Sequence, residues 1–108
     1  MKKSTEFLYL TTIGNKTGVL HEIEIWFVEH DGRYYLCSEM RERSHWVKNI
    51  RQNPAITFWV NGETYQGTGR ALDPVAEPEL HRQVEAAFDA KYKWSGGLMV
   101  ELSPDERI

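Results

Sequence analysis

The chain of 108 residues is long enough for one domain with a hydrophobic core and too short for two domains of ordinary size. Hydrophobic residues make up 41% and aromatic residues 12%, which is typical of a globular protein and argues against a disordered one. The formal net charge of −3 argues against a nucleic-acid-binding protein that relies on overall positive charge.

Cellular location follows from two features of the sequence. No apolar run reaches the roughly 18 residues that a membrane span needs, and no apolar signal segment follows the "MKKSTE" start. The lone Cys37 has no partner for an internal disulfide. We therefore expect a cytoplasmic protein without a membrane span.

Alternation of apolar and polar residues predicts strands in the first part of the chain. Residues 7–10 form an aromatic-aliphatic run, and in residues 20–28 apolar side chains alternate with glutamates. Asp31-Gly32 favours the positive φ angles of a tight hairpin turn, so residues 33–38 are expected to pair with residues 20–28.

A second hairpin and two helices complete the prediction. Asn61-Gly62 marks a turn between strands at 55–60 and 63–72. Between the hairpins, Ser44 is expected to be the N-cap of a short helix that ends before Pro54.

The longer helix is predicted to start near Pro74 or Pro78, with Asp73 as its cap, and to end near Tyr92. Its apolar stripe contains Leu80, Val84, Ala87 and Phe88. A last short strand follows at "LMVEL". This order predicts a mainly β protein of six antiparallel strands with flanking helices, a small closed barrel in a single domain spanning residues 1–108.

Catalysis by the chain's own side chains has little support. Its histidines lack the close partners that a metal site requires, so we expect no metal. Cys37 lies in a strand, where a small core thiol is expected. Glu22 and Glu24 share one strand face, which we interpret as a solvent-exposed face rather than an acid/base pair.

Two segments have the composition of an anion site. In "GNKTG", residues 14–18, Lys16 and Thr17 could bind an anion together with backbone N–H groups, although a simple surface turn explains these five residues better. In "SEMRERSHWVKN", a serine- and arginine-rich run precedes a helix N-terminus, where phosphate binds well; the run contains Ser38, Arg41, Arg43, Ser44 and Lys48. A polar loop with its arginines paired to Glu39 and Glu42 is an equally good interpretation.

Two further features leave alternatives open. Gly67 and Gly69 lie on one face of one strand, which indicates either a tight bend of the barrel or close approach of a flat ligand. The four tryptophans are many for this length, and some of them are expected in the core.

In order and spacing, "LTTIGNKTG", "IWFV", "DGRYYLCS" and "WVKNIRQNPAIT" resemble the deazaflavin-dependent nitroreductase family, from about Phe7 to Leu72. That family belongs to the flavin-binding split β-barrels, with the pyridoxamine phosphate oxidases as relatives. The resemblance implies a six-stranded antiparallel split barrel and a deazaflavin cofactor, with flavin mononucleotide (FMN) as the alternative.

The resemblance also implies the cofactor-binding residues. Lys16, Thr17, Ser38, Arg43 and Ser44 are expected to hold the cofactor's phosphate, and Trp46 and Asn49 to shape that wall. Tyr92 and Trp94 are expected on the substrate side.

The sequence departs from the family pattern by losing positive charge. Asn15 replaces an arginine, Leu20-His21 replaces a proline-arginine pair, and Glu39 replaces a lysine, in a loop that is shorter than usual. The choice between deazaflavin and FMN therefore stays open at this point.

We expect an oxidoreductase that transfers hydride between a flavin-type cofactor and a small oxidised substrate such as a quinone or nitro compound, and that forms a homodimer. A barrel that binds a flavin or another small molecule without turnover is the alternative. An oligonucleotide-binding barrel, which the order of the first five elements would also suit, is disfavoured by the negative charge, and no nucleic-acid partner is expected.

Overall fold

The structure, a computed structural model, describes residues 7–14 and 16–108. Its seven strands form one antiparallel sheet in the order β2-β1-β5-β6-β7-β4-β3. The strands are β1 (Phe7–Ile13), β2 (Leu20–Trp26), β3 (Val28–His30), β4 (Arg33–Ser38), β5 (Ala55–Val60), β6 (Glu63–Ala71) and β7 (Leu98–Arg107). A 3-10 turn, η1 (Arg41–Arg43), and the helices α1 (His45–Gln52) and α2 (Pro78–Tyr92) complete the described chain.

Both predicted hairpin turns are confirmed. Asp31 and Gly32 have φ angles of 56° and 78°, and Asn61 and Gly62 have φ angles of 52° and 84°. Two successive positive φ angles give a turn whose twist matches that of the flanking strands. The dipeptides therefore fix the β3–β4 and β5–β6 pairings locally.

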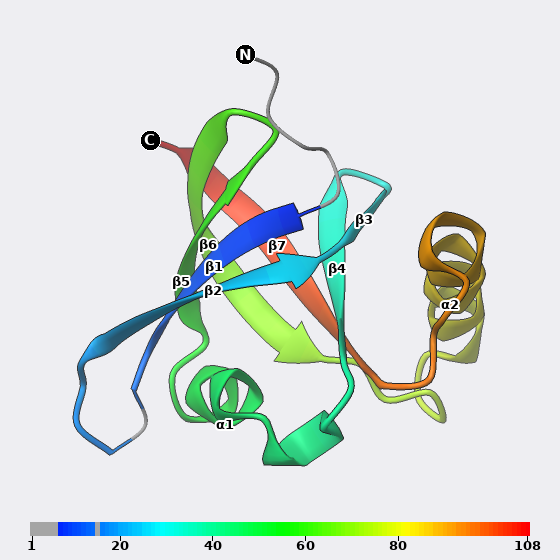
Figure 1. Ribbon diagram of the computed structural model, residues 1–108, viewed down its shortest axis with the longest axis horizontal. Coiled ribbons are helices and arrows are strands. Elements are labelled where there is room, and N and C mark those ends of the chain that lie inside the picture. Colours follow the sequence, from blue (N-terminus) through cyan, green and yellow to red (C-terminus); the bar gives the residue numbers. More distant parts are fainter. Residues whose placement is uncertain (1–6, 15) are drawn as a thin grey trace.

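The sheet curls into a barrel because its two edge strands are neighbours in sequence. Strands β2 and β3 lie at opposite edges of the sheet, yet only Phe27 separates them. The edges must therefore come together, as Figure 1 shows where β2 meets β3. The chain itself joins the two edges at this corner.

The prediction of six strands was wrong by one, because the segment 20–28 is broken at Phe27. The Tyr92 hydroxyl accepts a hydrogen bond from the Phe27 N–H at 3.1 Å and donates one to the Phe27 carbonyl at 2.9 Å. Lys91 Nζ donates to the same carbonyl at 2.8 Å. Groups from α2 thus take the backbone positions that a strand partner would fill, and β3 starts afresh at Val28 against β4.

Apolar clusters pack against both faces of the sheet, and the cluster inside the barrel is the larger one. The barrel interior contains one apolar cluster, formed by Leu8, Leu10, Phe27, Tyr34, Leu36, Val47, Ile50, Ile56, Phe58, Val60, Leu98, Val100 and Leu102. A second cluster lies outside the barrel beneath α2, formed by Val28, Tyr35, Cys37, Leu72, Val84, Phe88 and Met99. Helix α1 lies across one end of the barrel and α2 along its flank (Figure 1).

Helix α2 starts at Pro78, one of the two predicted starts, and ends at Tyr92 as expected. Asp73 does not cap it: its carboxylate accepts hydrogen bonds from the N–H groups of Val75 and Ala76 and closes the preceding turn instead. Val84 and Phe88 are fully buried, while Leu80 is only partly buried against them.

The two glycines of β6 serve packing. A Cβ at Gly67, beside a bulge in the β6–β7 pairing, would collide with the Ser103 carbonyl. A Cβ at Gly69 would lie 3.2 Å from the Ile50 side chain of α1. The bulge therefore accounts for Gly67, and the packing of α1 against β6 accounts for Gly69. No helix of the described chain is long and apolar enough to span a membrane.

A buried carboxylate ties the strands under α2 together. Glu101 of β7 accepts hydrogen bonds from the Tyr35 hydroxyl at 2.8 Å and from Arg70 Nε at 2.9 Å. Arg70 also binds Glu77 through both terminal nitrogens, at 2.6 and 2.9 Å. Burial and the Glu101 carboxylate together raise the pKa of Tyr35, so its hydroxyl stays a donor.

Removing the Tyr92 hydroxyl tests the joint at Phe27. We expect Tyr92→Phe to lower the free energy of unfolding by about 1–3 kcal/mol, because the partly buried Phe27 N–H loses its acceptor and the Phe27 carbonyl keeps only Lys91 of its two donors. Tyr9→Phe is the matched control, since its hydroxyl bonds Glu24 at an exposed site, and it should cost below about 1 kcal/mol. Urea denaturation measures both, and equal losses would contradict the role of Tyr92.

Candidate functional site

The β1–β2 connection is a tight loop that presents Lys16 and Thr17. The Gly14 N–H donates to the Val19 carbonyl at 2.7 Å, and the Gly18 N–H donates to the Gly14 carbonyl at 3.0 Å. Thr17 Oγ1 accepts a hydrogen bond from the Val19 N–H at 3.2 Å, so its hydroxyl hydrogen can still be donated to a ligand. Asn15, where the sequence loses a family arginine, lies outside the described residues.

A first cavity, of about 580 Å³, lies between this loop and α1; we call it the loop cavity. Its charged and titratable side chains are Lys16, His21, Glu22 and His45. The remaining lining residues are Thr12, Gly14, Thr17, Ile23, Ser44, Trp46 and Asn49. A cationic ammonium, hydroxyls and an amide around one hollow suit an anionic group.

The wall of the loop cavity nearest the core is fixed by a buried side-chain pair. Asn49 Nδ2 donates to Thr12 Oγ1 at 3.0 Å, and both residues are buried. This bond connects α1 to β1. Asn49 therefore shapes the wall, in line with its expected place.

A second cavity, of about 610 Å³, continues past Trp46; we call it the tryptophan cavity. Three tryptophans line it, Trp26, Trp46 and Trp94. The other lining residues are Phe7, Glu24, Ile25, Cys37, Ser38, Glu39, Met40 and Ser44. Flat aromatic walls of this kind suit a planar aromatic ligand.

The two cavities are adjacent because they share Ser44 and Trp46. Both residues lie at the start of α1, Ser44 as the N-cap and Trp46 in the first turn. Helix α1 thus stands between a polar hollow and an aromatic one. The pair can accommodate a single ligand with a flat ring at one end and an anionic group at the other.

Ser38 and Ser44 are engaged with each other. The Ser38 hydroxyl donates to the Arg41 carbonyl at 2.9 Å and lies 2.6 Å from Ser44 Oγ. Since each hydroxyl has one hydrogen, Ser44 donates to Ser38 in this arrangement. Their role as phosphate anchors stays a prediction, and it requires the Ser44 hydroxyl to turn toward the ligand.

Two expected site residues do not line either cavity. Arg43 is exposed on η1, next to Ser44. Its neighbour Arg41, with a φ of 54°, donates to the Gly96 carbonyl at 3.4 Å and lies 3.9 Å from Glu42. The arginine–glutamate pairing that the sequence left open therefore exists for Arg41.

Tyr92 is the second expected site residue that lines neither cavity. Its ring stacks on Trp26 with 4.4 Å between centroids and 5° between planes. Tyr92 supports a cavity wall from behind, whereas Trp94 lines the tryptophan cavity. Their place on the substrate side stays a prediction.

Sequence reasoning missed several lining residues, notably Trp26, Glu24 and Glu39. Trp26 and Glu24 alternate along β2 with the half-buried Ile23 and Ile25. Their alternation revealed a strand face but not which cavity that face would border.

Cys37 lines the tryptophan cavity but is a core thiol, as expected. Its Sγ accepts a hydrogen bond from the Gly97 N–H at 3.2 Å, and burial raises the pKa of the thiol to about 11. A thiol of this kind is a poor nucleophile at neutral pH.

Thiol labelling checks this conclusion. At pH 8 only about one thiol in a thousand would be ionised, so iodoacetamide should modify the native protein slowly and the urea-unfolded protein rapidly. The native rate should rise as the pH approaches 11. A native rate equal to the unfolded rate would contradict a buried, protonated Cys37.

Comparison with known proteins identifies the fold. A family model described as F420H(2)-dependent quinone reductase matches residues 2–96. No curated protein matches the chain. The structure of an F420-H2 dependent reductase (FDR-A) is similar at a TM-score of 0.68 and 18% identity, covering 95% of this chain and 98% of that one.

Two further structures share the fold. A conserved hypothetical protein from Mycobacterium tuberculosis is similar at a TM-score of 0.78 and 19% identity, covering 96% of this chain and 76% of that one. A putative pyridoxamine 5′-phosphate oxidase from Listeria innocua is similar at a TM-score of 0.74 and 10% identity, covering 95% and 86%. The predicted class, a split barrel of the pyridoxamine phosphate oxidase type, is confirmed.

Proposed function

The chain belongs to the F420H(2)-dependent quinone reductase family, and we propose that it transfers hydride from a reduced deazaflavin to a small oxidised substrate of the quinone class. Membership of this family makes it an oxidoreductase with a deazaflavin coenzyme. Nitro compounds, which the sequence resemblance also suggested, are the second substrate class within the same proposal. The other possibility that the sequence left open, a barrel that binds without turnover, is an outcome of the test below.

One observation carries the proposal: the loop cavity and the tryptophan cavity adjoin at Ser44 and Trp46. A deazaflavin coenzyme has a flat ring and a phosphate-bearing tail. The tryptophan cavity fits the ring, and the loop cavity fits the tail. The residues present therefore suit the group that the family uses.

The chain's own residues would bind and orient the coenzyme. We assign Lys16 and Thr17 to the phosphate as charge-assisted donors. We place Trp46 between ring and tail, with Asn49 keeping α1 in position through Thr12. Ser38, Ser44 and Arg43 remain proposed anchors from the adjoining Ser38–Ser44 segment.

When bound, a reduced deazaflavin supplies a hydride, which with one proton from water converts a quinone to a hydroquinone. The protein then needs no nucleophile or metal of its own for this step. Its contribution is to hold the ring against one side of the tryptophan cavity and leave the other side to the substrate. Trp94 is the proposed substrate-side wall, and Tyr92 supports Trp26 within it.

The quaternary structure and location are also proposals. Strand β5 and the adjoining parts of β1 and β2 lie on the side of the barrel away from α2 (Figure 1). Leu20 on β2 is exposed, and Trp59 on β5 packs edge-on against Tyr9 at 5.6 Å. We propose that this face forms a symmetric dimer interface, with Trp59 or Trp26 as anchors, in a cytoplasmic protein.

Coenzyme titration tests the assignment of Lys16. Lys16→Ala should weaken binding of a reduced deazaflavin by roughly 10- to 150-fold, because one charge-assisted hydrogen bond is worth about 1.5–3 kcal/mol. The remaining affinity should depend less on salt. Trp46→Ala should weaken binding without changing the salt dependence, since its contact is apolar. Absorbance or fluorescence titration gives the dissociation constants, with FMN as the comparison ligand.

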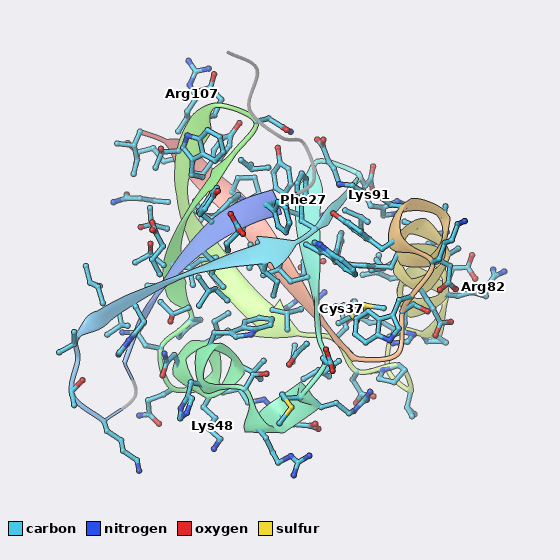
Figure 2. All side chains as sticks on the ribbon, viewed as in Figure 1. Phe27, Cys37, Lys48, Arg82, Lys91 and Arg107 are labelled. Carbon is cyan, nitrogen blue, oxygen red and sulfur yellow. The ribbon has the colours of Figure 1, made fainter. Side chains whose placement is uncertain are left out.

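Lys48→Ala serves as the control, and Arg43→Ala tests a proposed anchor. Lys48 lies on α1 together with Trp46 but points away from the barrel (Figure 2). Lys48→Ala should therefore leave the affinity for the deazaflavin unchanged. Arg43→Ala should match the loss at Lys16 if η1 reaches the phosphate, and an unchanged affinity would remove Arg43 from the site. If neither deazaflavin nor FMN binds below about millimolar, the cofactor site is wrong; if deazaflavin binds but no quinone or nitro compound is reduced, the barrel only binds.

Sedimentation tests the dimer. We expect a dimer at concentrations on the order of tens of micromolar, and a shift toward monomer for Leu20→Lys, which places a charge on the proposed interface. Glu29→Lys, on the exposed part of β3 and away from this face, should remain dimeric. A monomer at that concentration for the unmodified chain would contradict the proposal.

A further inference from the structure

The tryptophan cavity carries negative charge as well as aromatic walls. Two carboxylates, Glu24 and Glu39, line it, and its lining in the described part of the chain contains no lysine or arginine. Among the described residues, the salt bridges within 4.0 Å include neither carboxylate. This cavity therefore differs from the loop cavity, where Lys16 accompanies the carboxylate of Glu22.

The Glu24 carboxylate is held in place by a neutral partner. The Tyr9 hydroxyl donates to Glu24 Oε2 at 2.6 Å. The pKa of Tyr9 is raised, chiefly through this bond, so the tyrosine stays protonated and remains the donor. Glu24 thus presents an oriented charge rather than a mobile one.

Glu39 joins the lining of the cavity from the segment directly after β4. It follows Ser38, whose hydroxyl is bonded to Ser44 Oγ and the Arg41 carbonyl. The cation nearest to it in sequence, Arg41, directs its guanidinium to Gly96 and lies 3.9 Å from Glu42. The charge of Arg41 is thus shared with another carboxylate.

The aromatic walls add to the effect of these carboxylates. Trp26 is stacked on Tyr92, so its indole ring is held at a fixed angle. The faces of tryptophan rings attract both flat neutral rings and cations. Neither interaction favours an anion.

We propose that the tryptophan cavity is an acceptor subsite that selects uncharged and cationic aromatic compounds and excludes anionic ones through Glu24 and Glu39. As a substrate subsite, it rests on the proposed function. The redox balance is that of the parent reaction: the acceptor gains a hydride from the reduced deazaflavin and one proton from water. The charge of the two carboxylates changes which acceptors enter the cavity, and it does not change the number of electrons transferred.

Three naphthoquinones of similar size test the proposal: an uncharged one, one bearing a sulfonate and one bearing a trimethylammonium group. The kcat/KM with reduced deazaflavin is measured for each acceptor in the unmodified protein, Glu24→Gln, Glu39→Gln and the double variant. Each value is divided by the value for the uncharged acceptor in the same variant. This ratio removes effects on folding, coenzyme binding and the chemical step.

Each substitution should raise the sulfonate ratio and lower the trimethylammonium ratio by roughly two- to fivefold, the range expected of one solvent-accessible charge pair. High salt should reduce both effects. Glu29→Gln is the matched control, because Glu29 is an exposed carboxylate on β3 that does not line the cavity. Its ratios should equal those of the unmodified protein.

Unchanged ratios in the double variant, or the same change in Glu29→Gln, would overturn the proposal. A second measurement separates it from the proposed function: quenching of tryptophan fluorescence by the three naphthoquinones in protein without coenzyme. If no acceptor is reduced, the proposed function fails, while the quenching affinities still decide the charge selection. The charge selection is supported if the sulfonate binds more weakly than the uncharged naphthoquinone and if Glu24→Gln and Glu39→Gln restore its affinity. Equal affinities for the three naphthoquinones would reject it.

Discussion

The corner at Phe27 is the constraint on which the rest of the structure depends. One residue joins the two edge strands of the sheet, so the sheet has to curl until those edges meet. The Tyr92 hydroxyl and Lys91 satisfy the backbone at this corner, and Lys91 Nζ lies 3.9 Å from the Phe27 ring centroid. Figure 2 shows Phe27 and Lys91 side by side between the barrel and α2. Because Trp26 immediately precedes the corner, the same joint orients a wall of the tryptophan cavity.

The two helices have different tasks in this arrangement. Helix α2 covers an outer face of the barrel and buries Val84 and Phe88 there. Helix α1 closes one end of the barrel with Val47 and Ile50. The first turn of α1 then places Trp46 between a hollow that contains Lys16 and a hollow whose charged lining residues are carboxylates. A family whose coenzyme has a flat ring and an anionic tail can use both hollows, and Glu39, which stands where the family has a lysine, gives the aromatic hollow its second carboxylate.

Local signals in the sequence predicted most of the elements, and the errors have physical causes. The Asp-Gly and Asn-Gly turns were correct because the required φ angles are properties of those residues. The strand at residues 20–28 was broken because Tyr92, far away in sequence, supplies the hydrogen bonds of Phe27. Asp73 closed a turn instead of starting a helix, since its carboxylate reaches the N–H groups of Val75 and Ala76 first. The secondary-structure propensities of single residues could not reveal these competing hydrogen bonds.

For the site, the sequence by itself determined which residue types were present: a glycine-rich loop with Lys16, a helix that starts with Ser44 and Trp46, and no self-sufficient catalytic group. The order of these motifs also determined the family. Only the tertiary structure decided which of them adjoin, because cavity walls come from segments that pairing between strands brings together. It set Lys16 and Asn49 around one hollow, left Arg43 outside both, and turned Glu24 and Glu39 toward the tryptophans. The charge of a hollow depends on the side chains that face it, and sequence order does not encode that.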